Sequence, residues 1–266
     1  MGKQQEVMLY DDGHHRCISF TGLVQGEGIQ SNQFLILHGA HAAVIDPGGE
    51  LTYVPLTMAL SRYVKPEELD LILASHQDPD IISALGHWVK RTPARVAISR
   101  LWSRFIPHLA SAFAQSRSGG NIFDRILPID DQGGRIPLGD SYIQAVPAHF
   151  LHSVGNFQFY DPVSRILFSG DMGASVVEDV SGPVEDFTRH VPHMEGFHQR
   201  YMAGNRACKL WADMVRELDV DKLVPQHGPC FVGEQVGRFL DWVSQLQCGL
   251  DLMSEADYRP SERRLG

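Results

Sequence analysis

Several features that define other protein classes are missing from this sequence. Its 266 residues include only four cysteines, and none of them forms a CxxC pair. A zinc ribbon and a thioredoxin-type motif are therefore excluded, and we expect reduced thiols rather than a disulfide scaffold. No window approaches 18 consecutive apolar residues, and the N-terminus lacks the apolar stretch of a signal peptide. We expect a cytoplasmic protein without a membrane span.

Positive charge and hydrolase motifs are also scarce. Lysine and arginine total 23 against 32 aspartates and glutamates, which gives a net charge of -9 spread along the chain. That balance argues against nucleic acid or an anionic membrane as partner. The GxSxG elbow of serine hydrolases is absent. Hydrophobic residues make up 43% of the chain, an ordinary globular fraction.

Apolar runs and turn residues predict two halves of similar layout. In the first half we expect strands at 17–24, 34–37, 42–46, 69–74 and 95–99, and helices at 51–63, 81–90 and 101–115. In the second half we expect strands at 125–129, 135–138, 141–146, 157–160, 165–169 and 222–225, an irregular stretch at 172–195, and helices at 196–218 and 233–248. This order predicts an α/β fold in which helices flank two sheets, an αββα sandwich. We expect one domain over 1–266, with 1–15 (including His14 and His15) and 254–266 as loose, solvated tails.

Metal-capable side chains follow one of the predicted strands. His76, Asp78 and Asp80 lie at alternate positions directly after the apolar run 69–74. An extended chain would point all three side chains the same way. The alternative is a surface turn in which Asp80 caps the following helix.

Three later strands end in the same kind of residue. Asp171 follows the run 166–169, His227 follows 222–225, and His149 and His152 follow 141–146. A single Asp or His at a strand end is usually a cap or a solvated turn residue. Four such ends together favour a metal site.

The order HxDxD, HxxG, SGD and QHG resembles the metallo-β-lactamase superfamily, whose usual signature begins HxHxDH. This chain departs from that signature at Asp78 and Ile81, where histidines are expected. A carboxylate at the first of these positions is similar to the HxExD pattern of the flavodiiron branch. Further matches are Ser31-Asn32, Val44-Ile45-Asp46 and Tyr160-Asp161-Pro162.

This resemblance covers roughly residues 17–245 and implies the metallo-β-lactamase form of the sandwich, with two mixed sheets. Flavodiiron proteins normally continue into a flavodoxin domain, which these 266 residues do not include. The short form resembles stand-alone oxygen-binding diiron proteins, some of which are linked to bacterial sensing. Flavodiiron relatives pair head to tail, so the resemblance also implies a homodimer.

The resemblance further implies a ligand set. One metal would be held by His76, Asp78 and His152, and the second by Asp80 and His227, with Asp171 bridging them. We prefer His152 to His149 because the segment 152–155 resembles the superfamily's His-Thr-x-Gly turn. Three aspartates and three histidines without a thiolate suit iron or manganese better than zinc. We therefore expect two iron ions, with zinc or manganese as alternatives.

The function implied is binding of O2 or a related small oxidant such as NO or peroxide. Ile81 would leave a coordination position open for that ligand. The protein would be an oxygen sensor, with a signalling protein as partner, or a slow reductase that needs an external electron donor. The alternatives are a binuclear hydrolase of a phosphodiester, ester or lactone, and an interaction module without turnover.

Two further residues could support that chemistry. The resemblance puts the region around His198 and Tyr201 over the metal pocket. We therefore group His198 and Tyr201 with Asp171 as the catalytic set, the first two as gating or supporting residues. The alternative is a polar helix face with no such role.

Overall fold

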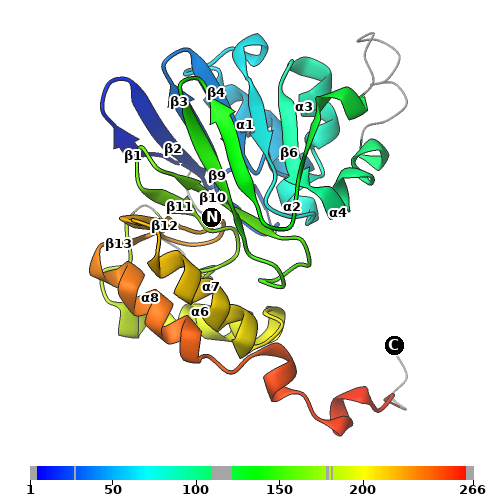
Figure 1. Ribbon diagram of the computed structural model, residues 1–266, viewed down its shortest axis with the longest axis vertical. Coiled ribbons are helices and arrows are strands. Elements are labelled where there is room, and N and C mark those ends of the chain that lie inside the picture. The colour runs from blue at the N-terminus through cyan, green and yellow to red at the C-terminus, as the bar shows by residue number, and fades with distance from the viewer. Residues whose placement is uncertain (1–4, 27, 110–121, 178–179, 181, 262–266) are drawn as a thin grey trace.

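The computed structural model describes residues 5–26, 28–109, 122–177, 180 and 182–261, and they form two facing β-sheets with helices on both outer sides (Figure 1). The first sheet contains, in spatial order, β1 (Gln5–Asp11), β2 (His15–Thr21), β3 (Gln33–His38), β4 (His41–Ile45), β5 (Leu71–Leu73), β6 (Arg95–Ser99) and β7 (Ile126–Ile129). The second contains β13 (Phe231–Val232), β12 (Lys222–Val224), β11 (Ile166–Phe168), β10 (Phe157–Asp161), β9 (Ser141–Pro147) and β8 (Gly134–Leu138). Both sheets mix parallel and antiparallel pairs.

Helices cover the outer face of each sheet (Figure 1). The first sheet carries α1 (Glu50–Leu60), α2 (Pro79–Ile82), α3 (Leu85–Arg91) and α4 (Arg100–Ser103). The second carries α6 (Phe187–Tyr201), α7 (Asn205–Arg216) and α8 (Glu234–Gln245). Short 3-10 helices occur at Pro66–Glu68, Ile106–His108, Ile122–Arg125, Gly249–Leu252 and Glu255–Tyr258. The predicted αββα sandwich is confirmed. Within the described part of the chain, no helix has the length and apolar character needed to cross a membrane.

The central strands are buried on both faces. In β3, Leu35 and Leu37 pack against the helices, whereas Phe34 and Ile36 pack against the second sheet. The rings of Phe34 and Phe168 lie 4.9 Å apart across the two sheets. Burial on both faces explains why this strand is a continuous apolar run instead of an alternating one.

Several expected boundaries were wrong. The segment 1–15 is not a loose tail throughout, because residues 5–11 form β1 and pair with β2. The helix expected at 81–90 is two short helices, α2 and α3. Of the helix expected at 101–115, the structure has only α4 and the turn Ile106–His108; residues 110–121 lie outside the described residues.

The irregular stretch expected at 172–195 ends earlier than predicted, and two helices replace the single helix expected at 196–218. The first, α6, begins at Phe187, where the Asp186 carboxylate accepts a hydrogen bond from the Arg189 amide. Pro192 lies inside α6. Because proline usually interrupts a helix, the sequence predicted an irregular stretch here. The chain then breaks, and α7 starts at Asn205, whose amide donates to Asp251 at 2.6 Å.

Candidate metal centre

The carboxyl ends of four strands meet at one edge of the sandwich. Strands β9 and β11 are both antiparallel to β10, and β12 is parallel to β11. All three therefore run in the same direction, and their carboxyl ends lead to His152, Asp171 and His227. Strand β5 of the other sheet leads to the segment 76–80. A backbone hydrogen bond from Phe157 to Ser75 joins the two sheets beside this edge.

Asp171 lies at the centre of the resulting cluster. Its Oδ2 atom is 2.8 Å from His152 Nε2 and 3.5 Å from His76 Nε2. Its Oδ1 atom is 3.4 Å from His227 Nε2. The two carboxylate oxygens therefore face different histidines.

The other two carboxylates complete two groups around Asp171. Asp78 Oδ2 lies 3.3 Å from His152 Nε2 and 3.7 Å from His76 Nε2. Asp80 Oδ2 lies 3.4 Å from His227 Nε2. The structure thus brings together all six side chains of the predicted ligand set.

Burial and charge act in opposite directions at this centre. Burial favours the neutral form of Asp171, but contacts with His152, His76 and His227 hold its pKa well below the usual range. Burial also opposes the charged form of His152, yet hydrogen bonds to Asp171 and Asp78 raise its pKa to about 10. Burial lowers the pKa of His76. One proton on His152 therefore offsets part of the negative charge that the aspartates concentrate here.

Neighbouring groups orient two of the histidines. His227 donates its Nδ1 hydrogen to the Gln30 carbonyl at 2.6 Å, so its Nε2 lone pair faces the aspartates. The Ser75 hydroxyl lies 2.9 Å from His76 Nδ1, which likewise leaves Nε2 for the centre. The Ser75 amide in turn donates to Asp46 at 2.8 Å, and burial raises the pKa of Asp46 to about 7. Such outer contacts set the tautomer and direction of metal-binding histidines. Sequence reasoning gave Gln30 and Ser75 no role and included Asp46 only in a family match, since no motif signals these contacts.

The loop that carries His76, Asp78 and Asp80 leaves these side chains available to bind a metal ion. Asp78 is the N-cap of α2 and Pro79 its first residue, but the Asp78 side chain makes no capping hydrogen bond. Gln77 accepts a hydrogen bond from the Ser153 hydroxyl at 2.6 Å, which ties this loop to the one that carries His152. His76 is buried, and Asp80 lies in the first turn of α2 with its Oδ2 atom toward His227, so the alternative of a surface turn capped by Asp80 is not supported.

Two nearby side chains lie outside the cluster. His149 Nε2 donates to the Asp131 carbonyl at 2.7 Å, and its ring packs on Phe157. Ile81 is fully buried in the apolar layer between the first sheet and its helices. The structure therefore selects His152 over His149, and Ile81 contributes no polar atom to the centre.

His198 and Tyr201 project from α6 in different ways. His198 is fully buried, its Nε2 accepts from the Gly173 amide at 3.0 Å, and its Nδ1 donates to the Met194 carbonyl at 2.8 Å. Burial lowers the pKa of His198 to about 4. Both ring nitrogens are used, so His198 fixes the turn after Asp171. Tyr201 is half exposed, and its ring lies 5.5 Å from the ring of His152.

The donor set fits a pair of metal ions. Asp171 is 3% exposed, yet its Oδ1 atom has no hydrogen-bond partner within the described residues. Leaving a buried carboxylate oxygen unpaired is costly, and a cation at that position would remove the cost. His76, Asp78 and His152 could hold one ion, Asp80 and His227 the other, with Asp171 between them.

A second polar cluster lies away from this edge and corrects an expectation. His15, expected in a solvated tail, is buried, with its Nε2 atom 2.7 Å from Asp161 Oδ2. Its Nδ1 atom is 3.0 Å from His38 Nδ1, and the Cys17 thiol donates to Asp161 at 3.4 Å. The pairing of β2 with β3 places His15 opposite His38, which the sequence did not reveal.

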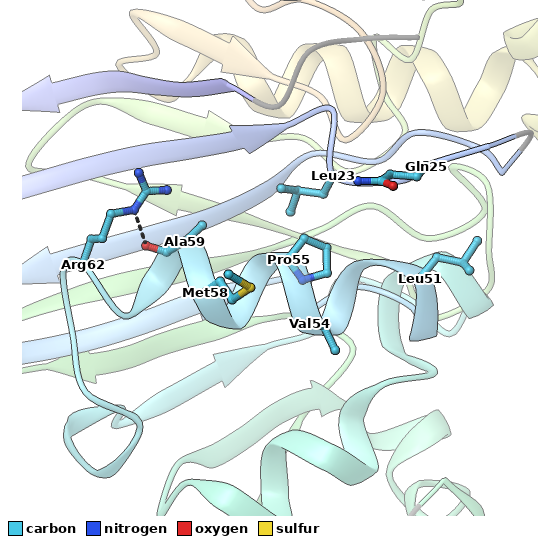
Figure 2. Close-up of a pocket in the computed structure, with 8 residues that line it drawn as sticks. All are labelled: Leu23, Gln25, Leu51, Val54, Pro55, Met58, Ala59 and Arg62. Carbon is cyan, nitrogen blue, oxygen red and sulfur yellow. Dashed lines mark hydrogen bonds between the residues drawn. The ribbon is translucent and has the colours of Figure 1, made fainter.

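A cavity of about 700 Å³ lies on the outer side of α1 (Figure 2). Its walls are mainly apolar and include Leu51, Val54 and Met58, with Arg62 at one end. None of the residues that line this cavity is one of the six candidate ligands, so the cavity is separate from the candidate centre.

Comparison with known proteins assigns the family. Residues 29–228 match the family described as ODP family beta lactamase. The chain belongs to this family. The apo state of chemotaxis sensor ODP from T. denticola is 40% identical, has a TM-score of 0.80, and is matched over 94% of this chain and 98% of its own. A second structure of chemotaxis sensor ODP, described as a peroxy diiron species, is also 40% identical with a TM-score of 0.80, over 93% and 97% of the two chains.

More distant relatives share the fold. A variant of the flavo di-iron protein from Thermotoga maritima is 20% identical, with a TM-score of 0.73, over 92% of this chain and 61% of that one. An uncharacterized protein of Methanocaldococcus jannaschii is 21% identical over 242 residues, 84% of this chain. The chain spans about half the length of that curated relative, 55%. The family match confirms the expected beta-lactamase resemblance, and the flavodiiron relatives confirm the shared fold.

Proposed function

We propose that this protein is a dinuclear non-haem iron protein that binds O2 or a related small oxidant and serves as an oxygen sensor. The relative that supports this is the chemotaxis sensor ODP, described as a peroxy diiron species and alike over nearly the whole of both chains. Its 40% identity is well above that of the flavodiiron proteins. We extend its diiron character to this chain on the strength of the six side chains described above.

The observation that carries the proposal is the orientation of Asp171. Its Oδ2 atom faces His76 and His152, and its Oδ1 atom faces His227. A carboxylate turned in this way suits a bridge between two cations about 3.5–4 Å apart. Three aspartates and three histidines make an oxygen–nitrogen set suited to iron or manganese, and no thiolate competes for a softer metal. When bound, a pair of ferrous ions would supply up to two electrons to the oxidant.

The protein's own groups control access to the centre. Phe197 and Tyr201 stack with ring centroids 4.7 Å apart, and both rings lie beside His152. They form an aromatic wall that limits water on that side. The Asp78 and Asp80 side chains are each 32% exposed, so a diatomic molecule would enter past them. In this proposal Tyr201 lines the entrance, and His198 is a positioning residue that holds the turn after Asp171.

Sensing is preferred to efficient reduction because the relative at 40% identity is described as a chemotaxis sensor. An external electron donor, a signalling partner and a homodimer remain part of the proposal. Sedimentation velocity tests the dimer, for which a single monomeric species would be the contrary result. The hydrolase alternative has no observation in its favour, and the carboxylate at position 78 in place of a histidine counts against it.

Comparing the parent protein with Asp78→His distinguishes oxygen binding from hydrolysis. The parent protein should respond to oxygen and show no turnover with phosphodiester, ester or lactone substrates. The variant should bind zinc more tightly relative to iron, because imidazole suits zinc better than a carboxylate does. Hydrolysis by the metal-loaded parent, at a rate above that of the metal-free protein, would overturn the proposal.

A further inference from the structure

Two of the four cysteines meet in the folded chain although 40 positions separate them. Cys208 lies on α7 and Cys248 follows α8, and their Sγ atoms are 3.7 Å apart. Both residues are fully buried. The length of a disulfide bond is about 2.05 Å, so the two sulfurs are in contact but unbonded.

We propose that Cys208 and Cys248 form a modification site at which hydrogen peroxide produces an intramolecular disulfide. This goes beyond the proposed function, since the peroxide is supplied from outside and the two sulfurs lie apart from the candidate ligands. It adds to the expectation of reduced thiols, since all four cysteines are free in this structure.

The backbone around the two sulfurs is already held in position. The Asn205 side-chain amide donates to the Ser244 and Leu246 carbonyls at 3.0 and 2.9 Å. The Asp251 carboxylate accepts from the amides of Asn205 and Cys248 at 2.6 and 3.1 Å. These contacts join the start of α7 to the segment after α8. The backbone that carries the two sulfurs, which lie 3.7 Å apart, is therefore kept in place by these hydrogen bonds.

The same segment is connected to the wall of the candidate metal centre. The Leu250 amide donates to the Ala203 carbonyl at 2.9 Å, and the Ala203 amide donates to the Phe150 carbonyl at 3.2 Å. Phe150 lies two positions before His152, and Tyr201 packs on the His152 ring. The chain after α8 runs away from the helical layer (Figure 1). A disulfide at its base would fasten this C-terminal segment to the turn between α6 and α7.

The chemistry balances with one peroxide per pair of thiols. One thiolate attacks a peroxide oxygen, which breaks the O–O bond, gives a sulfenic acid and releases water after proton transfer. The second thiol then attacks that sulfur, forms the S–S bond and expels the sulfenic oxygen as a second water. The two sulfurs lose two electrons in total, and the peroxide gains them.

Burial sets the rate of this reaction. Burial raises the pKa of both thiols. The nearby Cys248 sulfur and the Asp251 carboxylate raise the pKa of Cys208 further. Because the thiolate is the reactive form, the first step should be slow and should follow local opening of the segment after α8. Cys230, which lies just before β13, serves as the reference thiol because it is half-buried whereas Cys208 and Cys248 are fully buried.

The test is peroxide treatment of the purified full-length protein, with and without a chelator that removes iron. After alkylation in denaturant and tryptic digestion, mass spectrometry should find the tripeptide 207–209 joined to the peptide that begins at Phe239, with the loss of two hydrogens. The linked peptide should appear in the parent and in Cys230→Ser, with and without iron. It should vanish on reduction and be absent from Cys208→Ser and Cys248→Ser. Circular dichroism checks that each variant is folded.

Two results would overturn the proposal. In the first, Cys208 and Cys248 remain fully alkylatable after Cys230 has been oxidised. In the second, each sulfur is oxidised separately to a sulfinic acid without a linked peptide. Iron content, measured on the same samples, reports on the proposed function independently, so failure of one inference can be told from failure of the other.

Discussion

The molecule contains two clusters built from histidine and aspartate, and they differ in how their carboxylates are used. Asp161 accepts hydrogen bonds from the amides of Val163 and Ser164, both at 3.2 Å, and contacts His15 at 2.7 Å. Asp171 is equally secluded, but its Oδ1 atom has no hydrogen-bond partner within the described residues. Residue types alone do not separate the two sites. Hydrogen-bond satisfaction does, and it supports the proposal that the Asp171 cluster is the one that holds cations.

The Asp161 cluster satisfies its carboxylate with hydrogen bonds. Its contacts run in series from Asp161 through His15 and His38 to Asp140. Both carboxyl groups have lowered pKa values: that of Asp161 through His15 and Ser164 despite burial, that of Asp140 through its hydrogen bond with His38. Partners within the cluster therefore hold both carboxylates in their charged form.

The largest expected effect comes from Asp171→Asn. An amide cannot bridge two cations as a carboxylate does, so iron content should fall from about two per chain to near zero. Metal analysis after anaerobic loading with ferrous iron measures the loss. Asp161→Asn is the matched control, because it makes the same change in the other cluster and should retain the parent's iron. Equal iron in Asp171→Asn and the parent would contradict the assignment.

Asp161→Asn should instead affect folding. Removing one partner of a buried ionic network typically costs about 3–5 kcal/mol, so the free energy of unfolding should decrease by an amount in that range. Urea titration followed by circular dichroism measures it. If Asp161→Asn loses iron and keeps its stability, the roles given to the two clusters are reversed.

His227→Ala sharpens the comparison within the metal centre. His227 faces Asp80 and only one oxygen of Asp171, so its loss should empty one position and leave about one iron per chain. His149→Ala should leave the iron content unchanged, because the His149 ring is bound to the Asp131 carbonyl outside the cluster. Loss of both ions from His227→Ala would mean that the two positions cannot be filled separately.

A smaller effect concerns pH. The pKa of His152 in the metal-free protein is raised to about 10, so this ring is protonated at neutral pH. A metal ligand must be unprotonated, so loading should release that proton and affinity should rise with pH, about tenfold per unit for each proton released. Calorimetric titration with ferrous iron in two buffers of different ionisation enthalpy counts the protons. Heats that do not depend on the buffer would contradict this.

The sequence could predict the ends of the strands because each predicted ligand follows a short apolar run. It could not predict contacts between distant segments. His15 and Asp161 lie 146 positions apart and Cys208 and Cys248 lie 40 apart, and no periodic pattern links such pairs. The predicted helix boundaries were wrong where Pro192 lies inside α6 and where the distant Asp251 accepts a hydrogen bond from the first amide of α7.

The most direct test of the central claim is an anaerobic metal analysis combined with absorption spectra before and after admission of air. Protein purified from iron-replete cells should contain about two iron ions per chain, and its reduced form should change spectrum when oxygen is admitted. Protein that carries zinc alone, with a spectrum unchanged by air, would contradict the account.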